Sequence, residues 1–451
     1  METEKMKNDF FQLVIFGVTG DLSRRKVLPA IGRLILKQKL PSKLQIIGVG
    51  RQQFSVDELL ASMEEFLDQD ETESVREKLA KIMFTFSMDL KNPAQYTNLK
   101  IYLDKLATPK TQRLFCFLTP ADIFQDIVIG LGEVGLNSSM NSSDNLPRIL
   151  IEKPFGEDLA SAKALANTID KYFQKEQVYL VDHYLFKAPV QNLLELRFKN
   201  PIFQTLWQNN LIESVKIGIY EDFGISNRIE FYEKTGALKD VAQNHLLELL
   251  AIMMMECPTE RNQEALHQQK LKFLNSIIPV KNNQATRAQY YGYREEVGNS
   301  QSTTETFIRL ELKSDNKKWS QTKMVVETGK ALDSKNTQIE VVIKPLESGG
   351  GKNIITIQLQ PPMKVNMKLW SKNLNSDELM SLDLQTKSLE YLNTDYESMF
   401  LAMIHGERSF FVPVQEALTL WRIIEPLITQ GEEAGGDLLF YEQGTKAEQI
   451  F

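Results

Sequence analysis

Cysteine and histidine are scarce in this chain of 451 residues, which contains two cysteines and four histidines. Cys116 and Cys257 lie in apolar surroundings and lack the spacing of a metal site, so we expect reduced thiols, a cytoplasmic location and no bound metal. Because histidine changes charge near neutral pH, those with polar neighbours are the first candidates for proton transfer or for binding a dianion.

An excess of positive charge is also lacking. The chain has 52 lysines and arginines against 59 aspartates and glutamates, which gives a formal net charge of −7. A general nucleic-acid binder has the opposite balance, so we exclude that class. Any anionic ligand must therefore be bound by a local group of Lys and Arg side chains.

Long hydrophobic runs are absent too. The most apolar segment, LLELLAIMMMEC from Leu246, contains Glu248 and is too short to cross a bilayer. The first ten residues, METEKMKNDF, are charged and lack the apolar core of a secretory signal. We therefore expect a soluble protein that does not enter a membrane, with two or three domains for its length.

The first part of the chain alternates apolar, strand-like runs with helical stretches. The strand-like runs are FQLVIF from Phe11, LQIIGV from Leu44, RLFCFL from Arg113 and RILIE from Arg148. Segments 56–67 and 159–175 have helical spacing. This alternation of strands and helices is typical of a doubly wound parallel sheet and predicts a Rossmann-like α/β coenzyme domain over residues 1–181.

The pattern changes in residues 182–451, for which we predict an α+β domain. A helix is expected over 189–199 and a longer one over 236–256, with a half-exposed strand at 213–220 between them. Closely spaced strand patterns follow at 306–312, 322–327, 338–343 and 354–359. Because most of these strands have no helix between them, they predict a large, mostly antiparallel sheet.

GVTGDL, Gly17 to Leu22, follows the first strand and opens a helix. Glycines at such a turn let the backbone approach a pyrophosphate, and the helix N-terminus offers free amides. The segment lacks the full dinucleotide fingerprint, so a plain strand-to-helix turn also fits. Arg51 follows the second strand where an acid would hold the ribose of NAD, and its guanidinium favours the 2′-phosphate of NADP.

Two further motifs follow strands of the predicted parallel sheet. Lys153 in EKPFG would lie beyond a strand's carboxyl end, where open α/β sheets bind ligands, although a surface lysine also fits. VDHYLFK places Asp182, His183, Tyr184 and Lys187 together. One carboxylate and three donors suit a phosphate or polyol ligand, whereas one histidine and one carboxylate are too few ligands for a metal.

A dozen segments occur in the order found in glucose-6-phosphate dehydrogenases, from about residue 12 to residue 430. These segments are GVTGDLSRRK, GVGR, RLFCFLTP, RILIEKPFG, VDHYLFK, VQNLLELRFKNPIFQTLWQ, YEDFGI, GALKDVAQNHLLELLA, YREEVG, TETFIRLEL, ETGKALDSK and YESMFLAMIHGERSFF. EKPFG, DHYL and QNHLL at this spacing are together highly specific. The chain thus resembles this family over nearly its whole length.

The resemblance implies an NADP-dependent enzyme that oxidises D-glucose 6-phosphate at C1, the first step of the oxidative pentose phosphate pathway, with NAD as a weaker alternative. His245 would be the general base, and Asp182 would orient it. Lys153 would contact both the sugar and the coenzyme. The remaining implied substrate contacts are His183, Tyr184, Lys187, Glu221, Asp240, Lys330, Lys335 and Gln360. The implied coenzyme contacts are Gly17, Thr19, Gly20, Asp21, Leu22 and Arg51.

The chain departs from the family pattern at several places. The family reads DHYLGKE where this chain has Phe186 and Ala188, and it reads RGGYYD where this chain has RIEFYE from Arg228. Segment 278–293 is also shorter than in the family. The chain stops soon after YEQGT, and for this reason we do not expect a second, structural NADP site.

The resemblance also implies a homodimer that pairs through the exposed face of the second domain's sheet. Two alternatives remain beside the enzyme. One is a non-catalytic homologue that binds sugar phosphate or NADP, and the other is a dehydrogenase of another hexose phosphate, for which Phe186 is the only support.

Overall fold

The computed structural model describes residues 10–139, 145–207, 211–226, 228–260, 262–345, 352–359, 363–370, 379–385, 393–431 and 438–450. The chain forms two compact units. The first contains residues 1–186 and 392–414, and the second contains residues 187–391 and 415–451. The boundary expected from the sequence, after residue 181, precedes the observed division, and the return of 392–414 to the first unit was not anticipated.

The first unit is built on a six-stranded sheet in the order β3-β2-β1-β4-β5-β6, and every neighbouring pair is parallel. The doubly wound parallel sheet predicted from the sequence is therefore confirmed. Its strands are β1 Phe10–Phe16, β2 Lys43–Gly50, β3 Met83–Ser87, β4 Thr111–Phe117, β5 Arg148–Ile151 and β6 Val178–Leu180.

The helices of the first unit cover this sheet in two groups. Because crossovers between parallel strands are right-handed, the helices before and after the reversal at β1 fall on opposite faces. Accordingly α2 packs against α4 and α14, while α6 packs against α5 and α7. The helices are α2 Leu28–Leu36, α3 Val56–Ala61, α4 Gln69–Ala80, α5 Pro93–Leu106, α6 Phe124–Glu133, α7 Leu159–Tyr172 and α14 Asp395–His405, with a π-helix η2 at Ser23–Val27 before α2.

Several helix ends are specified by the local sequence. Ser55 and Glu58 form a capping box at the start of α3, and Thr394 caps the start of α14 through its hydroxyl oxygen. Gly406, with φ 76°, ends α14 in the left-handed region that glycine tolerates. These caps satisfy backbone groups that a helix end leaves without partners.

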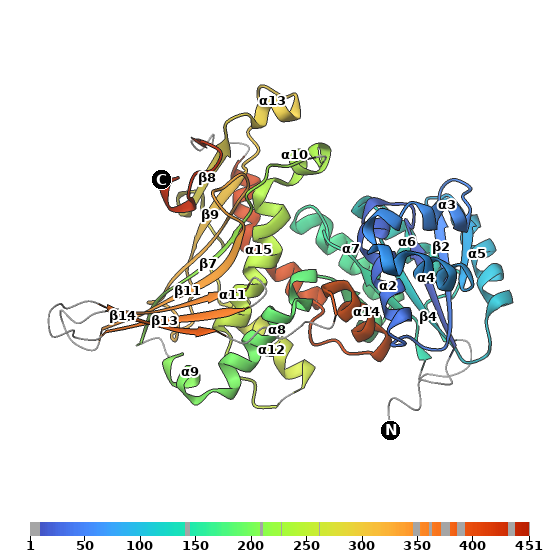
Figure 1. Ribbon diagram of the computed structural model, residues 1–451, viewed down its shortest axis with the longest axis horizontal. Coiled ribbons are helices and arrows are strands. Elements are labelled where there is room, and N and C mark those ends of the chain that lie inside the picture. The colour runs from blue at the N-terminus through green and yellow to red at the C-terminus, as the bar shows by residue number, and fades with distance from the viewer. Residues whose placement is uncertain are drawn as a thin grey trace. The chain divides into compact units, whose positions relative to one another are not determined.

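The second unit contains a nine-stranded sheet among the described residues, in the order β14-β13-β12-β11-β7-β10-β9-β8-β15 (Figure 1). All neighbours are antiparallel except β7 with β10 and β8 with β15. This confirms the predicted large, mostly antiparallel sheet. Its strands are β7 Ile212–Tyr220, β8 Ala285–Tyr290, β9 Phe307–Leu312, β10 Lys323–Gly329, β11 Asn336–Ile343, β12 Asn353–Gln358, β13 Lys364–Trp370, β14 Leu379–Gln385 and β15 Leu439–Tyr441.

The long helix expected over 236–256 is interrupted. Gly236, with φ 56° and ψ −172°, kinks the chain near the end of α10, and residues Leu238–Leu246 then form a π-helix, η8, before α11 begins. The helices of this unit are α8 Ala188–Lys199, α9 Pro201–Leu206, α10 Ile229–Ala237, η8 Leu238–Leu246, α11 Leu247–Met254, α12 Gln263–Asn275, α13 Tyr293–Val297 and α15 Val414–Gly431. All eight residues of α11 are buried, so this apolar segment is a core helix.

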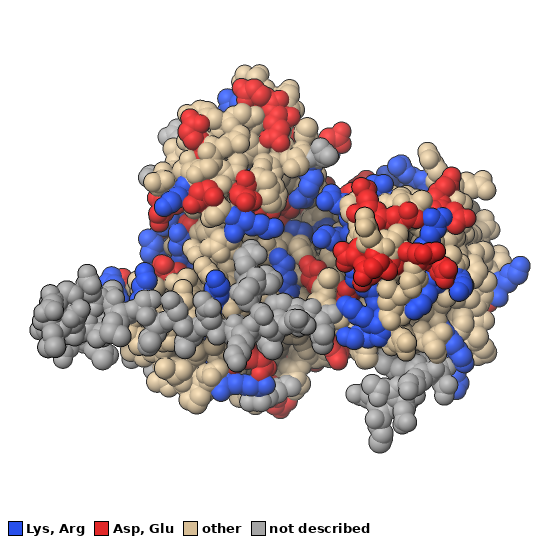
Figure 2. Space-filling model, viewed as in Figure 1, with Lys and Arg blue, Asp and Glu red and all other residues tan. Residues whose placement is uncertain are grey.

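Among the described residues, no helix combines the length and apolarity needed to cross a bilayer. Charged side chains of both signs are interspersed over the face of the molecule shown in Figure 2, as the balanced composition leads us to expect.

Candidate active site

The predicted coenzyme turn connects β1 to the helix that follows it. Gly17 has φ +80°, and a Cβ placed there would lie 2.8 Å from the carbonyl oxygen of Leu118. Its N–H donates to the carbonyl of Val49 at 3.0 Å, and the N–H of Gly20 donates to the carbonyl of Gly17 at 2.9 Å. Position 17 thus requires glycine for both its backbone angle and its space, and the tight turn suits the close approach of a pyrophosphate.

The other side chains assigned to the coenzyme lie near this turn or at the end of β2. Asp21 is exposed and faces Arg24 and Arg25 at 3.9 and 3.7 Å. Arg51 directly follows β2, is exposed, and has no ion-pair partner among the residues that the structure describes. Because neighbouring β1 and β2 are parallel, the turn and Arg51 lie at the same edge of the sheet.

Glu152 and Lys153 follow β5 at that same edge. Glu152 is 5% exposed, and its carboxyl group accepts a hydrogen bond from the hydroxyl of Tyr396 in α14. Burial raises the pKa of Glu152 to about 7, which Tyr396 and Lys153 oppose and the nearby Asp182 carboxylate reinforces. A carboxyl group that titrates near neutral pH at the carboxyl ends of the strands marks this edge as a candidate functional site.

Asp182 and His183 follow β6, the next strand of the sheet. Asp182 is buried, and its Oδ1 accepts a hydrogen bond from the N–H of Tyr184 at 2.9 Å, at the start of the short helix η7, His183–Phe186. The His183 ring lies 5.3 Å from the ring of Tyr184 and stacks on Tyr396 at 6.2 Å with an interplanar angle of 17°. The structure therefore brings Glu152, Asp182 and His183 together around Tyr396.

Phe186, which replaces the expected glycine, is used in packing. Its side chain is 2% exposed and lies 4.8 Å from the ring of Phe411 and 6.3 Å from that of Phe410. The ring belongs to the core of the first unit. Its presence therefore has a structural explanation and does not by itself favour another substrate.

A cavity of about 300 Å³ in the first unit lies between the helix that follows the coenzyme turn and the start of α14. Arg25, Lys26 and Arg33 line it together with Asp395 and Tyr396. Sequence reasoning assigned no role to Lys26 or Tyr396, although both lie in segments that carry the family resemblance. An excess of basic groups suits an anionic ligand.

In the second unit, the carboxyl ends of β7 and β10 meet because these two strands are parallel, with Tyr220 beside Gly329. Glu221 and Lys330 follow them and form an ion pair. The Lys330 ammonium also lies 5.4 Å from the ring centre of Phe223 and 5.2 Å from that of Tyr232. Lys335 lies 5.9 Å from the ring centre of Phe223.

Asp240 and His245 are both carried by the π-helix η8 and are 5% and 2% exposed. Asp240 Oδ1 lies 3.4 Å from Nη2 of Arg228, and the backbone N–H of His245 donates to Oδ1 of Asn244 at 2.7 Å. The pKa of Tyr232 is raised far above its usual range. Burial is the main cause, and the negative charges of Asp240 and of other neighbours, including Glu221, add to it. Glu221, Asp240 and Lys330 thus surround Tyr232.

Two predicted substrate residues remain. Lys187 lies at the start of α8, where its carbonyl accepts the first hydrogen bonds of the helix from Val190 and Gln191. Gln360 lies outside the described residues. The roles assigned to the individual site residues therefore stay predictions.

A parallel sheet with a tight glycine turn after its first strand is typical of dehydrogenases of the dinucleotide-binding class. Residues 14–192 match the family model described as "Glucose-6-phosphate dehydrogenase, NAD binding domain", and residues 194–449 match "Glucose-6-phosphate dehydrogenase, C-terminal domain". The chain belongs to the glucose-6-phosphate dehydrogenase family, as its sequence motifs predict.

Named relatives and solved structures agree with this assignment. Glucose-6-phosphate 1-dehydrogenase of Chlamydia muridarum is 32% identical over 93% of this chain and 90% of its own length, and that of Rhizobium meliloti is 32% identical over 96% and 94%. The crystal structure of the Mycobacterium avium enzyme aligns with a TM-score of 0.85 at 29% identity, covering 97% of this chain and 94% of that one. A glucose-6-phosphate dehydrogenase in complex with glucose-6-phosphate aligns with a TM-score of 0.89 at 26% identity, covering 97% and 95%.

Proposed function

We propose that this protein oxidises D-glucose 6-phosphate at C1 to 6-phospho-D-glucono-1,5-lactone with transfer of hydride to NADP. One observation carries the proposal: a chain that matches the family over nearly its whole length keeps His245, buried on the π-helix that also bears Asp240.

In this reaction C1 loses a hydride and its hydroxyl group loses a proton, so that the C1–O bond becomes the carbonyl of the lactone. The imidazole of His245 takes the proton, which is the task of a general base. The nicotinamide ring, when bound, accepts the hydride. The protein's own contribution is to hold the sugar and to accept the proton.

The residues assigned to the sugar and those assigned to its phosphate form two groups. Glu221, Asp240 and Lys330, which surround Tyr232, present two carboxylates and one ammonium group to sugar hydroxyls. His183, Tyr184 and Lys187 are assigned to the phosphate, because a dianion is best bound by charge-assisted donors. Lys153 is assigned to both substrate and coenzyme.

NADP is the proposed coenzyme, with NAD as a weaker alternative. The Gly17 turn has the close-packed backbone that a pyrophosphate requires, and Arg51 is exposed at the end of β2, where its guanidinium can bind a 2′-phosphate.

A homodimer through the sheet of the second unit is also proposed. On one face of that sheet, Lys216 of β7 pairs with Glu327 of β10 at 2.7 Å, and Arg309 of β9 lies 3.4 Å from Glu327. The Glu327 side chain is fully buried and holds the partly exposed Lys216 in place. These charged groups give the sheet a polar face suited to pairing across a two-fold axis. Light scattering at micromolar concentration tests this proposal, and a monomer would contradict it.

A cytoplasmic location is proposed from the two cysteines, which are both free thiols.

The decisive experiment is an assay of the purified protein with several hexose phosphates and both coenzymes, followed by absorbance of the reduced nicotinamide. The proposal requires turnover with glucose 6-phosphate and NADP. Binding of glucose 6-phosphate without turnover would favour the non-catalytic homologue instead, and faster turnover of another hexose phosphate would change the substrate.

A further inference from the structure

The π-helix η8 that carries His245 needs support from outside itself. Its i→i+5 hydrogen bonding is rare in proteins and occurs mostly as single-turn bulges, frequently at functional sites. Here nine consecutive residues, Leu238–Leu246, adopt it. A segment with this hydrogen bonding is held by its tertiary contacts, and three sets of such contacts are present in the second unit.

The first set holds the start of η8. Gly236 turns the chain with φ 56°, and the N–H of Ala237 then donates to the carbonyl oxygen of Glu305 at 3.0 Å. The side chain of the same glutamate accepts the N–H of Leu238 at 3.0 Å. Glu305 therefore satisfies two N–H groups at a helix start, where intrahelical partners are lacking.

The second set lies one turn beyond His245. Glu248 of α11 forms an ion pair with Lys270 of α12, and the same ammonium pairs with Glu416 of α15 at 2.5 Å. All three side chains are almost completely buried, with exposures of 0 to 2%. The cluster joins three helices at one point of the helix that carries His245.

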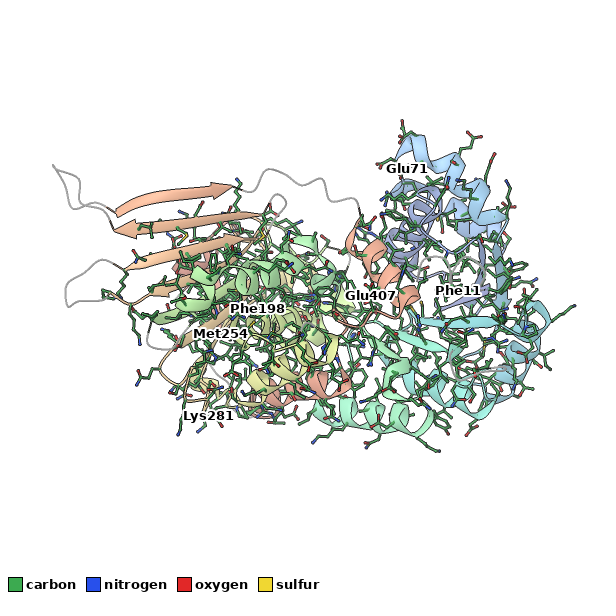
Figure 3. All side chains as sticks on the ribbon, turned by 90° about the horizontal axis from the view of Figure 1, so that it is seen from below. Phe11, Glu71, Phe198, Met254, Lys281 and Glu407 are labelled. Carbon is green, nitrogen blue, oxygen red and sulfur yellow. The ribbon has the colours of Figure 1, made fainter. Side chains whose placement is uncertain are left out.

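The third set holds the end of α11. The guanidinium of Arg197 in α8 donates to the carbonyl oxygens of Ile252 and Met255. Figure 3 shows the labelled Phe198 and Met254 near each other in this region, where α8 packs against α11. The continuous segment formed by η8 and α11 is thus held at three places: at the start of η8, one turn after His245, and at the end of α11.

We propose that Glu305 and the Lys270–Glu248–Glu416 cluster are positioning residues for catalysis: they fix the π-helical turn and thereby the place of the His245 imidazole. The proposal rests on the proposed role of His245 as the base. Neither group is assigned to touch the substrate or coenzyme.

A purely stabilising role is the alternative, and the physical chemistry of buried ions distinguishes the two. Replacing a buried ion cluster with apolar residues of similar size is often neutral or even stabilising, whereas removing one partner leaves an uncompensated charge. Apolar replacements can therefore restore stability. They cannot replace the directional ion pairs that hold the helix in one position. A displacement of about 1 Å of a catalytic group can cost about 100-fold in rate.

Glu305 offers a matched pair of variants. Glu305→Gln keeps an oxygen that can accept the Leu238 N–H, and Glu305→Ala removes it. We expect kcat to fall about 10- to 100-fold in Glu305→Ala, with KM for the coenzyme unchanged and near-normal kcat in Glu305→Gln. Equal kcat values in the two variants would overturn the role of this side chain.

The charged cluster is tested with Lys270→Met and with the triple variant Lys270→Met, Glu248→Leu, Glu416→Leu. The single change should lower the melting temperature, and the triple change should restore it because no buried charge is left. We expect kcat to stay reduced in the restored protein. Wild-type kcat in the stable triple variant would show that the cluster serves stability alone.

Hydrogen exchange separates a failure of this proposal from a failure of the proposed function. In Glu305→Ala and in the triple variant, the amides of residues 238–246 should exchange faster than in the wild type, while those of the first unit should not change. This result does not require turnover. If the wild type failed to oxidise glucose 6-phosphate but these amides lost protection, only the proposed function would be wrong; unchanged exchange would overturn the positioning proposal.

Discussion

Tyr396 donates its hydroxyl hydrogen bond to the buried carboxyl group of Glu152 and stacks its ring on His183. A residue from α14 therefore contacts the ends of both β5 and β6, more than 200 positions earlier in the sequence. Lys153 and Asp182 are the other ionisable groups that act on Glu152. This arrangement has a consequence for the pH dependence of stability.

Burial raises the folded-state pKa of Glu152 from 4.5 to about 7, so the folded protein binds a proton that the unfolded chain has lost. The resulting stability is complete below about pH 4.5 and is lost as the pH rises to about 7, with a size on the order of 3 kcal/mol. In Glu152→Gln this dependence should be absent. Urea unfolding of both proteins between pH 5 and 8 measures it, and parallel curves would contradict the prediction.

Replacing His245 by asparagine should largely abolish turnover while binding of glucose 6-phosphate survives. Asparagine can form hydrogen bonds but cannot take the proton, and general-base help contributes roughly 10²- to 10⁴-fold. Steady-state rates and calorimetric titration with the sugar phosphate provide the two readouts. A variant with near-normal kcat would show that another group is the base.

Lys187→Ala should raise KM for glucose 6-phosphate much more than KM for glucose. The substitution removes a charge-assisted contact to phosphate, which is about twice as strong as a neutral hydrogen bond. Lys199, exposed at the other end of α8, offers a control because the change Lys199→Ala removes a lysine from the same helix. Equal losses for the two sugars in Lys187→Ala would place the phosphate elsewhere.

Arg51→Ala should reduce the preference for NADP over NAD by weakening NADP. The guanidinium can bind a 2′-phosphate through paired hydrogen bonds, whereas NAD has only a hydroxyl group there. Gln52 and Gln53 follow it and exclude neither coenzyme. Initial rates with both coenzymes give the ratio of kcat/KM, and an unchanged ratio would remove Arg51 from the coenzyme site.

The sequence predicted both sheets because their strands have clear periodicities. Residues 13–16 and 114–118 are continuous apolar runs, as buried parallel strands require, whereas 213–220 alternates. β3, Met83–Ser87, was not predicted because only its first residue is buried and its apolar pattern is weak. Segment 56–67, expected as one helix, divides into α3 and the short helix Glu64–Phe66. Other elements, such as β8 and α12, had no prediction, whereas the limits of the remaining predicted elements agree with the structure within a few residues.

Site residues could be predicted from the sequence only where they belong to a recognisable motif. The π-helix could not be foreseen, because apolar spacing over 236–256 suits an α-helix equally well. Tyr396 and Glu305 were missed as contributors because their partners, Glu152 and Leu238, are distant in sequence. Long-range hydrogen bonds of this kind leave no local periodicity.

The return of residues 392–414 to the first unit bears on the order in which the protein can fold during synthesis. Tyr396, Met399, Phe400, Met403 and Phe411 from this segment are part of the buried core that contains Tyr179 and Phe186. A ribosome must therefore translate nearly the whole chain before the coenzyme unit can bury that core. Until then the nascent unit exposes apolar surface that a chaperone could recognise, and a fragment ending at residue 186 would lack this part of its core.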